Sequence, residues 1–468
     1  MKGRFLDYWA RAESGPIVFE KDFDLKVYWP RLRDLAKKYK IEYDPNHIVP
    51  MDDEQLDNVF KAAYELVLDV GILCQDTERL IKFKPEELQE TFDNMPQELV
   101  LGLGEEAIRL SHKGFEDYDN QRNPHFVQGR ILGPISPEVY TSISMSYLKE
   151  PIMDMNHFQG VIGRVNGVDV KPNSPFEMLS EMERVALVRD ACRRAGRPGF
   201  SDGGTMPTGY RSQIVADHPG WGTTIGDQRC TNLMPQMKTN YEYMCKALEM
   251  YQYGAHTWGG SIAYIGSLSG GPATSAIQVC ADNIATDLVY QLSLHGSWAL
   301  DALYFSNSSR TALFASLWGG AAYLKHVNHP AYIGPSWQQT AKLGKEYFWE
   351  HVAGAIGSSV LGMGVCGGTG AQSAGPDCAC GLGVRLAGEV GQAVGRARLT
   401  RKQANDLVLK ILEKYQPMID SRTLHTIGVN YQDAYDVESA TPKPEFLEIY
   451  NEVKKELVEM GLPMRVFD

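Results

Sequence analysis

The chain has 468 residues, 43% of them hydrophobic, and its formal net charge at pH 7 is -12. This size allows a large buried core, and an acidic balance without a long basic run argues against nucleic acid as a partner. No apolar run reaches the roughly 18 residues of a membrane span, and the first residues lack the apolar segment of a signal peptide, so we expect a cytoplasmic protein with no membrane partner.

The amino-terminal quarter has a helical pattern. In residues 52–71 the apolar side chains recur at helical spacing, and Gly71 is placed to end the helix. Residues 84–95 begin another helix. We therefore expect residues 1–120 to form a helical extension that packs on a larger core.

The sequence pattern is different in residues 121–400. Short apolar runs end in glycine-rich loops, as in residues 125–137 and 197–209, and helical stretches such as 177–195 and 275–296 lie between them. Alternation of strand and helix predicts a parallel α/β architecture, and its size fits a (β/α)8 TIM barrel. A doubly wound sheet is the alternative.

The carboxyl-terminal residues are helical again. Apolar stripes run through residues 400–415 and 441–462, with Pro444 suited to a first helical turn and Gly461 to a stop. We expect residues 401–468 to be helices packed on the barrel.

Two metal or nucleotide patterns are weak. Residues 362–367 match G-x-G-x-x-G, but the sequence that follows is a loop rather than the helix that would hold a pyrophosphate. Cys366, Cys378 and Cys380, with Asp377, could ligate a metal, yet their spacing fits zinc poorly. The eight cysteines are otherwise sparse, as expected of reduced thiols. Zinc stays an alternative for which the sequence gives no ligand set.

Several polar side chains lie near the predicted strand tops. His256, His326 and His329 are candidates for acid–base or metal chemistry. Arg229 and Arg310 are candidate clamps for an anion, because the planar guanidinium suits a carboxylate. An aromatic group that could line a flat pocket comprises Tyr253, Trp258, Tyr264, Tyr304, Phe305, Tyr332 and Trp337.

Several segments, in the same order along nearly the whole chain, resemble the monomethylamine methyltransferases of methanogens. They include QELVLGLGEEAIRL, GPISPEVYTSISMSYL, AGRPG, GSWALDALYFSNSSRT, LAGEVGQAV and YDVESATPKPEF. The resemblance implies a (β/α)8 barrel that moves a methyl group onto a corrinoid cobalt carried by a partner protein. It also implies a homo-oligomer.

The resemblance also shows what this chain lacks. In the family, the loop after AGRPG carries pyrrolysine, whose ring is thought to bind the amine, whereas the matching place here is Asp202 or Gly203. The chain therefore resembles a monomethylamine methyltransferase that has no pyrrolysine at this position.

Other family positions are also changed. A glutamate of the family falls on Arg229, another falls near residues 273–274, and a glutamine falls on Asn328 with His329 beside it. A pocket that has lost its electrophile and carboxylates suits an alkylammonium ion poorly.

These changes favour O-demethylation of a methoxylated aromatic compound, with the methyl group passing to the corrinoid cobalt. A leaving phenolate needs protonation or a Lewis acid, and general-acid catalysis typically increases the reaction rate ~10²–10⁴-fold. The candidates for acid or supporting roles are His256, His326, His329, Asp202 and Asn328. The candidates for holding the ring and a ring carboxylate are Arg229, Trp258, Tyr264, Tyr304, Arg310 and Tyr332.

Two alternatives stay open. One is methyl transfer from a methylated amine or betaine, with the aromatic group acting as a cation–π cage. Arg229 argues against that alternative. The other is a non-catalytic barrel that binds the corrinoid protein.

Overall fold

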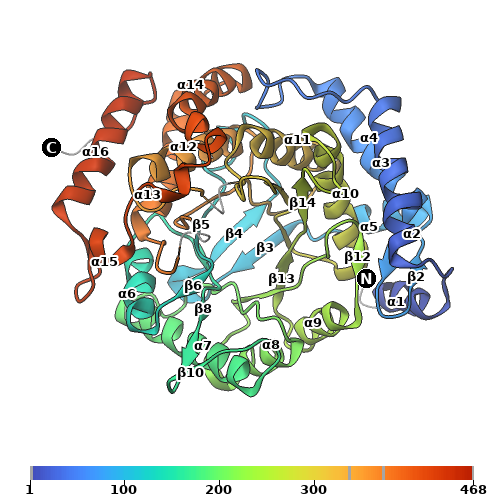
Figure 1. The fold of residues 1–468 in the computed structure, drawn as a ribbon, viewed down its shortest axis with the longest axis horizontal. Coiled ribbons are helices and arrows are strands. Elements are labelled where there is room, and N and C mark those ends of the chain that lie inside the picture. Colours follow the sequence, from blue (N-terminus) through green and yellow to red (C-terminus); the bar gives the residue numbers. More distant parts are fainter. Residues whose placement is uncertain (1–3, 336–338, 372–374, 466–468) are drawn as a thin grey trace.

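A computed structural model describes residues 4–335, 339–371 and 375–465. A ring of helices encloses a centre of strands and loops (Figure 1). Strands and helices alternate through the middle of the chain, so the predicted α/β class is confirmed.

The centre is built from short extended segments joined in a closed circuit. Neighbours are linked by parallel ladders, by single parallel bridges or, between Asp202 and Gln228, by a backbone hydrogen bond. In circuit order the segments are β5 (Val127–Ile131), β7 (Met155–Phe158), the bridge at Ser201, β11 (Gln228–Cys230), β13 (His256–Gly259), β15 (Leu294–His295), residues 332–333 and β17 (Val365–Gly367), which pairs with β5.

Beyond the carboxyl ends of these strands, two further parallel pairs extend the circuit. They are β6 (Pro134–Ile135) with β8 (Val161–Ile162), and β14 (Ile262–Ile265) with β16 (Trp298–Asp301). Gly260 marks the break between β13 and β14, where a Cβ would lie 2.7 Å from the Gly296 backbone. The backbones at Gly260 and Gly296 therefore lie too close together for a side chain at residue 260.

Helices follow most strands and cover the outside of the circuit. They are α6 (Pro137–Leu148), α7 (Pro175–Arg194), α8 (Tyr210–Ala216), α9 (Tyr241–Gln252), α10 (Pro272–Tyr290), α11 (Arg310–His326), α12 (Lys345–Val360) and α13 (Gly381–Ala397). The helices predicted in residues 177–195 and 275–296 correspond to α7 and α10. In the described residues, no helix combines the length and the apolar character needed to cross a membrane.

The amino-terminal extension packs on α10 and α11 through α4 (Asp53–Val70), the helix predicted in residues 52–71. The Asp52 side chain accepts hydrogen bonds from the backbone N–H groups of Glu54 and Gln55, which caps this helix. The other helical elements before β5 are α1 (Arg4–Ser14), α2 (Glu20–Asp22), η1 (Phe23–Tyr28), α3 (Trp29–Lys38), α5 (Pro85–Asp93) and η2 (Gly104–Glu106).

The extension also contains strands, which the helical prediction for residues 1–120 missed. β1 (Ile72–Cys74) and β2 (Arg79–Ile81) pair with each other, and β1 also pairs with β12 (Lys238–Thr239). The hairpin of β3 (Glu98–Leu101) and β4 (Ile108–Ser111) packs Leu99, Leu101 and Leu110 into the interior cluster that includes Trp258 and Leu294. The leucines of this hairpin thus add apolar side chains to the interior of the strand circuit.

The carboxyl-terminal segment is helical as predicted. Its main elements are α14 (Arg401–Asp420), α15 (Tyr431–Ala434) and α16 (Pro444–Glu459), with a short hairpin of β18 (Tyr435–Asp436) and β19 (Thr441–Pro442). α12 packs on both α14 and α16. These helices thicken the outer layer on one side of the molecule (Figure 1).

Candidate active site

A cavity of about 380 Å³ lies where the strands of the circuit end. Most residues lining it are at or just after the carboxyl ends of β5, β7, β11, β13 and β15, whereas Met206 follows the bridge at Ser201 and Tyr243 lies on α9. The polar and aromatic ones are Arg130, Gln159, Asn232, Tyr243, Tyr264 and Trp298. None of the described lining residues is acidic.

Arg130 is the charged group of this cavity. It lies near the end of β5, and its residue is 1% exposed. Its guanidinium carbon is 5.3 Å from the ring centre of Trp258 and 5.7 Å from that of Trp298. Burial lowers the pKa of Arg130 to about 10, and the partly compensating groups are the thiols of Cys366 and Cys230 rather than carboxylates. The two indole faces stabilise the cation by cation–π attraction.

Gln159 lies beside Arg130 and presents a second donor. Its Oε1 is 3.5 Å from Arg130 Nη2, at the limit of a hydrogen bond. Its Nε2 has no hydrogen-bond partner among the described residues, apart from a weak interaction with the Cys230 thiol. A buried donor in this state is ready for a ligand.

Strand alternation explains which side chains reach the interior. Because successive side chains of a strand point to opposite faces, Gln128 and Arg130 share the inner face of β5. Below Arg130, Gln128 Nε2 is 3.0 Å from His157 Nε2, which is 3.2 Å from Gln228 Oε1 on β11. A layer of hydrogen-bonded polar side chains thus forms the floor under the cavity.

The loop at Asp202 and Gly203 is held tightly against this floor. Trp258 Nε1 donates to the Gly203 carbonyl oxygen at 2.6 Å, and the Trp258 ring stacks on His157 at 3.7 Å. A Cβ at Gly203 would lie 1.8 Å from His157 Cδ2. Asp202 points the other way, with Oδ2 3.5 Å from Arg184 Nη2 of α7. Neither residue extends a side chain into the cavity.

Arg229 does not reach the cavity either. It follows Gln228 on β11 and therefore faces the helices. Its Nη2 donates to the Asp217 carbonyl oxygen at 3.0 Å, and its Nε is 3.7 Å from Asp217 Oδ2. The prediction that Arg229 clamps an anion in the cavity is therefore wrong, because its guanidinium contacts Asp217 on the helix side of the strand.

Comparison with known proteins agrees with this architecture. The family profile of monomethylamine methyltransferase MtmB matches residues 4–462. The chain belongs to this family. It is 27% identical to monomethylamine methyltransferase MtmB2 of Methanosarcina acetivorans over 460 residues, with 97% of each chain covered. It is also 27% identical to MtmB1 of Methanosarcina barkeri over 473 residues, with the same coverage.

Solved structures of the family are also similar. The crystal structure of the Methanosarcina barkeri monomethylamine methyltransferase superimposes with a TM-score of 0.90 and 25% sequence identity, covering 98% of each chain. A hydroxylamine complex of MtmB gives the same TM-score, identity and coverage. The chain is therefore an enzyme of the MtmB methyltransferase family with its fold conserved from end to end.

The predicted acid–base histidines of this MtmB-family chain lie outside the cavity. His256 opens β13 and is therefore at the opposite, amino end of the circuit. His326 ends α11, where Nε2 is 2.9 Å from Asp57 Oδ1 of α4 and the ring stacks on Phe60. Asn328 is exposed and donates to Gln97 Oε1. The i, i+3 pair at 326 and 329 precedes a strand, so it marks the amino end and not the mouth.

His329 belongs to a buried cluster behind the strands. Among the described residues, a trio of close potential metal ligands is formed by Asp287, His295 and His329. His329 Nε2 is 3.1 Å from the Leu292 carbonyl oxygen, and its Nδ1 accepts the Ala331 N–H, so both ring nitrogens are engaged. His295 Nε2 is 2.6 Å from Asp287 Oδ1. The trio is a satisfied hydrogen-bond network and does not fit a zinc site.

The other predicted ligand groups are divided between cavity and exterior. Tyr264 lines the cavity, whereas Trp258 is fully buried behind it, with its ring beside Arg130. Tyr304 lines a different depression of about 290 Å³ beside Phe305. Arg310 Nη1 donates to the Pro45 carbonyl oxygen, and Tyr332 is buried with its hydroxyl donating to Ser297.

Three sequence predictions remain: those for Tyr253, Trp337 and the glycine-rich pattern in residues 362–367. Tyr253 ends α9 near His218, away from the cavity lining. Trp337 lies outside the described residues. Residues 365–367 of the glycine-rich pattern form β17, and the next helix in the described chain begins only at Gly381. No pyrophosphate-binding helix therefore follows the pattern.

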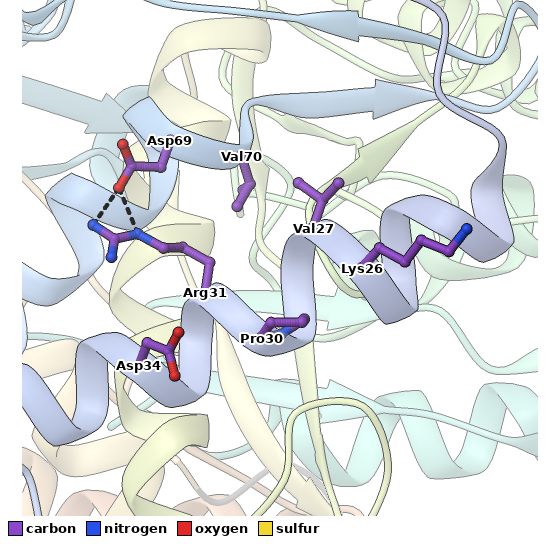
Figure 2. A pocket seen from close by; sticks show the side chains of 7 residues that line it. All are labelled: Lys26, Val27, Pro30, Arg31, Asp34, Asp69 and Val70. Carbon is purple, nitrogen blue, oxygen red and sulfur yellow. Dashed lines mark hydrogen bonds and ion pairs between the residues drawn. The ribbon is translucent and has the colours of Figure 1, made fainter.

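A second depression, of about 420 Å³, lies on the amino-terminal extension and is unrelated to the strand ends. Figure 2 shows it between η1, α3 and the end of α4, where Arg31 and Asp69 form an ion pair. Both partners are partly exposed. The depression offers only a solvated surface pair, so it is not a competing active site.

Sequence reasoning missed Arg130, Gln159 and Trp298. The signal for Arg130 was present in the segment VQGRILGP, where an arginine lies inside a buried strand just before the turn at Gly133. A charged residue at the carboxyl end of a parallel strand is the position where barrel enzymes place functional groups.

Proposed function

We propose that the closed circuit is a (β/α)8 barrel over residues 121–400, with helical extensions before and after it. The parallel neighbours, the outer helices and the match to family structures support this. In such barrels the active site lies at the carboxyl ends of the strands. The Arg130 cavity occupies that place.

We propose that the enzyme transfers a methyl group from a methylated amine to the cobalt of a corrinoid protein. The observation that carries the proposal is the 380 Å³ cavity at the strand ends of a chain matched by the MtmB family over residues 4–462. Relatives named for monomethylamine support an amine donor.

The cavity residues orient the donor rather than react with it. A methyl group passing to cobalt needs an in-line path, so the donor must be held with its methyl group toward the incoming partner. The side chains of Leu233 and Ile262 and the rings of Tyr243 and Tyr264 give apolar surface for methyl groups, and a quaternary or protonated amine gains cation–π attraction at the tyrosine rings. Their packing also keeps water from the reacting groups.

A methoxylated aromatic compound is the second candidate. It is favoured by one observation, the guanidinium between two indoles in a cavity without a described acidic residue. It is opposed by the placement of His256, His326 and His329, because none of them can protonate a leaving phenolate from outside the cavity.

The partner proteins follow from the same proposal. The corrinoid protein would approach the rim formed by β6, β8, β14 and β16, because the cavity is at that end of the barrel. A homo-oligomer stays a prediction taken from the family resemblance.

The test is methylation of the cobalt itself. The protein is mixed with reduced corrinoid protein and, separately, with methylamines, betaines and methoxybenzoates, and the cobalt spectrum is followed. Methyl-cobalt formed from amines supports the proposal. Methyl-cobalt formed only from methoxybenzoates rejects the amine donor and supports the second candidate, a methoxylated aromatic compound. No methyl-cobalt from any donor rejects methyl transfer and leaves a binding barrel.

A further inference from the structure

We propose that the donor carries a carboxylate and that Arg130 binds it inside the cavity. This inference rests on the proposed function, since it names the class of donor for the same site. The shared chemistry is a methyl group at one end of a small molecule and a carboxylate at the other.

The first argument is the balance of charge. Arg130 is 1% exposed, keeps its positive charge at physiological pH and lies in a cavity whose described lining holds no acidic residue. Residues 336–338 and 372–374, which are not described, are SWQ and QSA and add no acidic residue. A bare alkylammonium ion would meet a like charge here, whereas a carboxylate meets its complement.

The second argument is the arrangement of donors. Gln159 Nε2 is buried beside the guanidinium and has only the weak interaction with the Cys230 thiol. A planar guanidinium and an adjacent amide N–H can hold both oxygens of one carboxylate. The apolar lining of Leu233 and Ile262 and the tyrosine rings lie around the remaining volume. The donor's methyl end is therefore directed away from Arg130.

The third argument is the size of the cavity. A volume of about 380 Å³ is in the range of sites for ordinary small-molecule ligands and is spacious for a donor of two heavy atoms. The Gly203 loop leaves no side chain in this space, and Asp202 is turned toward Arg184. The volume is thus available to a longer molecule.

The experiment compares acids with their own alcohols by titration calorimetry. Glycine betaine is paired with choline, and 4-methoxybenzoate with 4-methoxybenzyl alcohol, so each pair differs only in the carboxylate. We expect one acid to bind the wild-type protein at least about 30-fold more tightly than its alcohol, as for a buried charge pair. The pair in which the acid binds more tightly shows whether the donor is a betaine or a methoxybenzoate.

Variants then assign the preference to Arg130. Arg130→Met removes the acid-over-alcohol preference, and Arg130→Lys retains part of it because the charge stays while the fork is lost. Arg109→Met is the control, since this arginine is exposed and paired with Glu98 on the β3–β4 hairpin. If Arg130→Met does not fold, the acid–alcohol comparison on the wild-type protein still decides.

The outcomes separate this inference from the proposed function. Equal binding of acid and alcohol, binding of neither, or a preference that survives Arg130→Met overturns the inference. Methyl transfer from simple methylamines without any carboxylate preference overturns the inference alone. A carboxylate preference without methyl-cobalt from any donor overturns the proposed function alone, because calorimetry needs no turnover.

Discussion

Two arginines of neighbouring regions, Arg130 and Arg229, have nearly the same burial and opposite surroundings. Each is 1% exposed and lies on a short strand of the closed circuit. Arg130 faces the interior, where it lines the cavity and lies beside the rings of Trp258 and Trp298. Arg229 faces the helices, against the backbone and carboxylate of Asp217. Burial alone therefore does not distinguish a functional arginine from a structural one.

The outer region holds a network of charges that pair with each other. Arg184 lies near Asp202 and Glu181, and Arg189 is ion-paired with Asp227. These residues join α7 to the loops beside the strands. Charges in this region are paired with each other within the fold, whereas the described lining of the Arg130 cavity holds no acidic residue.

The largest effect should come from breaking the outer pair. Arg229→Met leaves Asp217 buried without its cation, and we expect a loss of about 3–5 kcal/mol in the free energy of unfolding. Arg130→Met should lose much less, because no described carboxylate of the cavity lining is left behind. Urea unfolding of both variants measures this. Equal losses in the two variants would remove the distinction between the two regions.

A smaller effect is expected at the loop between the regions. Gly203→Ala places a Cβ within 1.8 Å of His157 Cδ2 and 2.7 Å of the Asn156 carbonyl oxygen. Overpacking of this kind costs about 1–3 kcal/mol, and displacement of the His157 and Trp258 stack should also weaken donor binding. Thermal unfolding and calorimetry measure the two effects.

Gly163→Ala is the matched control for the loop variant. An added Cβ at Gly163 meets nothing within 4 Å. We expect wild-type stability and binding. If Gly203→Ala behaved like Gly163→Ala, the loop would not be held as tightly as its contacts indicate.

Much of the fold is predictable from the sequence because helices carry a periodic signal. The apolar spacing in residues 52–71 and 400–415 predicts α4 and α14, whose buried faces follow that spacing. The β3–β4 hairpin was missed because four-residue strands give too short a pattern to separate from a helix.

The site was predictable only in part. Tyr264 could be placed at the cavity because a large aromatic residue next to a glycine-rich loop indicates a strand end, but the same reasoning misplaced Tyr304. Arg130 and Arg229 could not be told apart, since a shift of one residue exchanges the two faces of a strand. His329 was misplaced because its strand begins after it, so it lies at the amino end.

A pH effect should follow from the outer region. Glu249 of α9 is 3% exposed, and burial, aided by the charge of Asp217, raises its pKa to about 8. The folded chain then holds a proton that the unfolded chain releases above about pH 4.3. Stability is therefore lost as pH rises from about 4.3 to about 8.

Glu249→Gln removes this titration. The free energy of unfolding of the variant relative to the wild type should grow by up to about 1.4 kcal/mol per pH unit in that window. Urea unfolding across the window measures the difference. Parallel curves for the two proteins would show that Glu249 is ionised in the folded state.

The smallest effect is expected at His326. The histidine and Asp57 form a partly exposed pair on the outside of α11 and α4, with side chains 30% and 33% exposed. Such pairs contribute less than about 1 kcal/mol, so His326→Phe, which keeps a ring against Phe60 and removes only the pair, should lower the unfolding free energy by no more than that. Since the pair lies outside the strand circuit and its cavity, donor binding and cobalt methylation should stay at the wild-type level. Loss of methylation with an unchanged unfolding curve would return His326 to the reaction as an acid and would break the division between cavity and exterior.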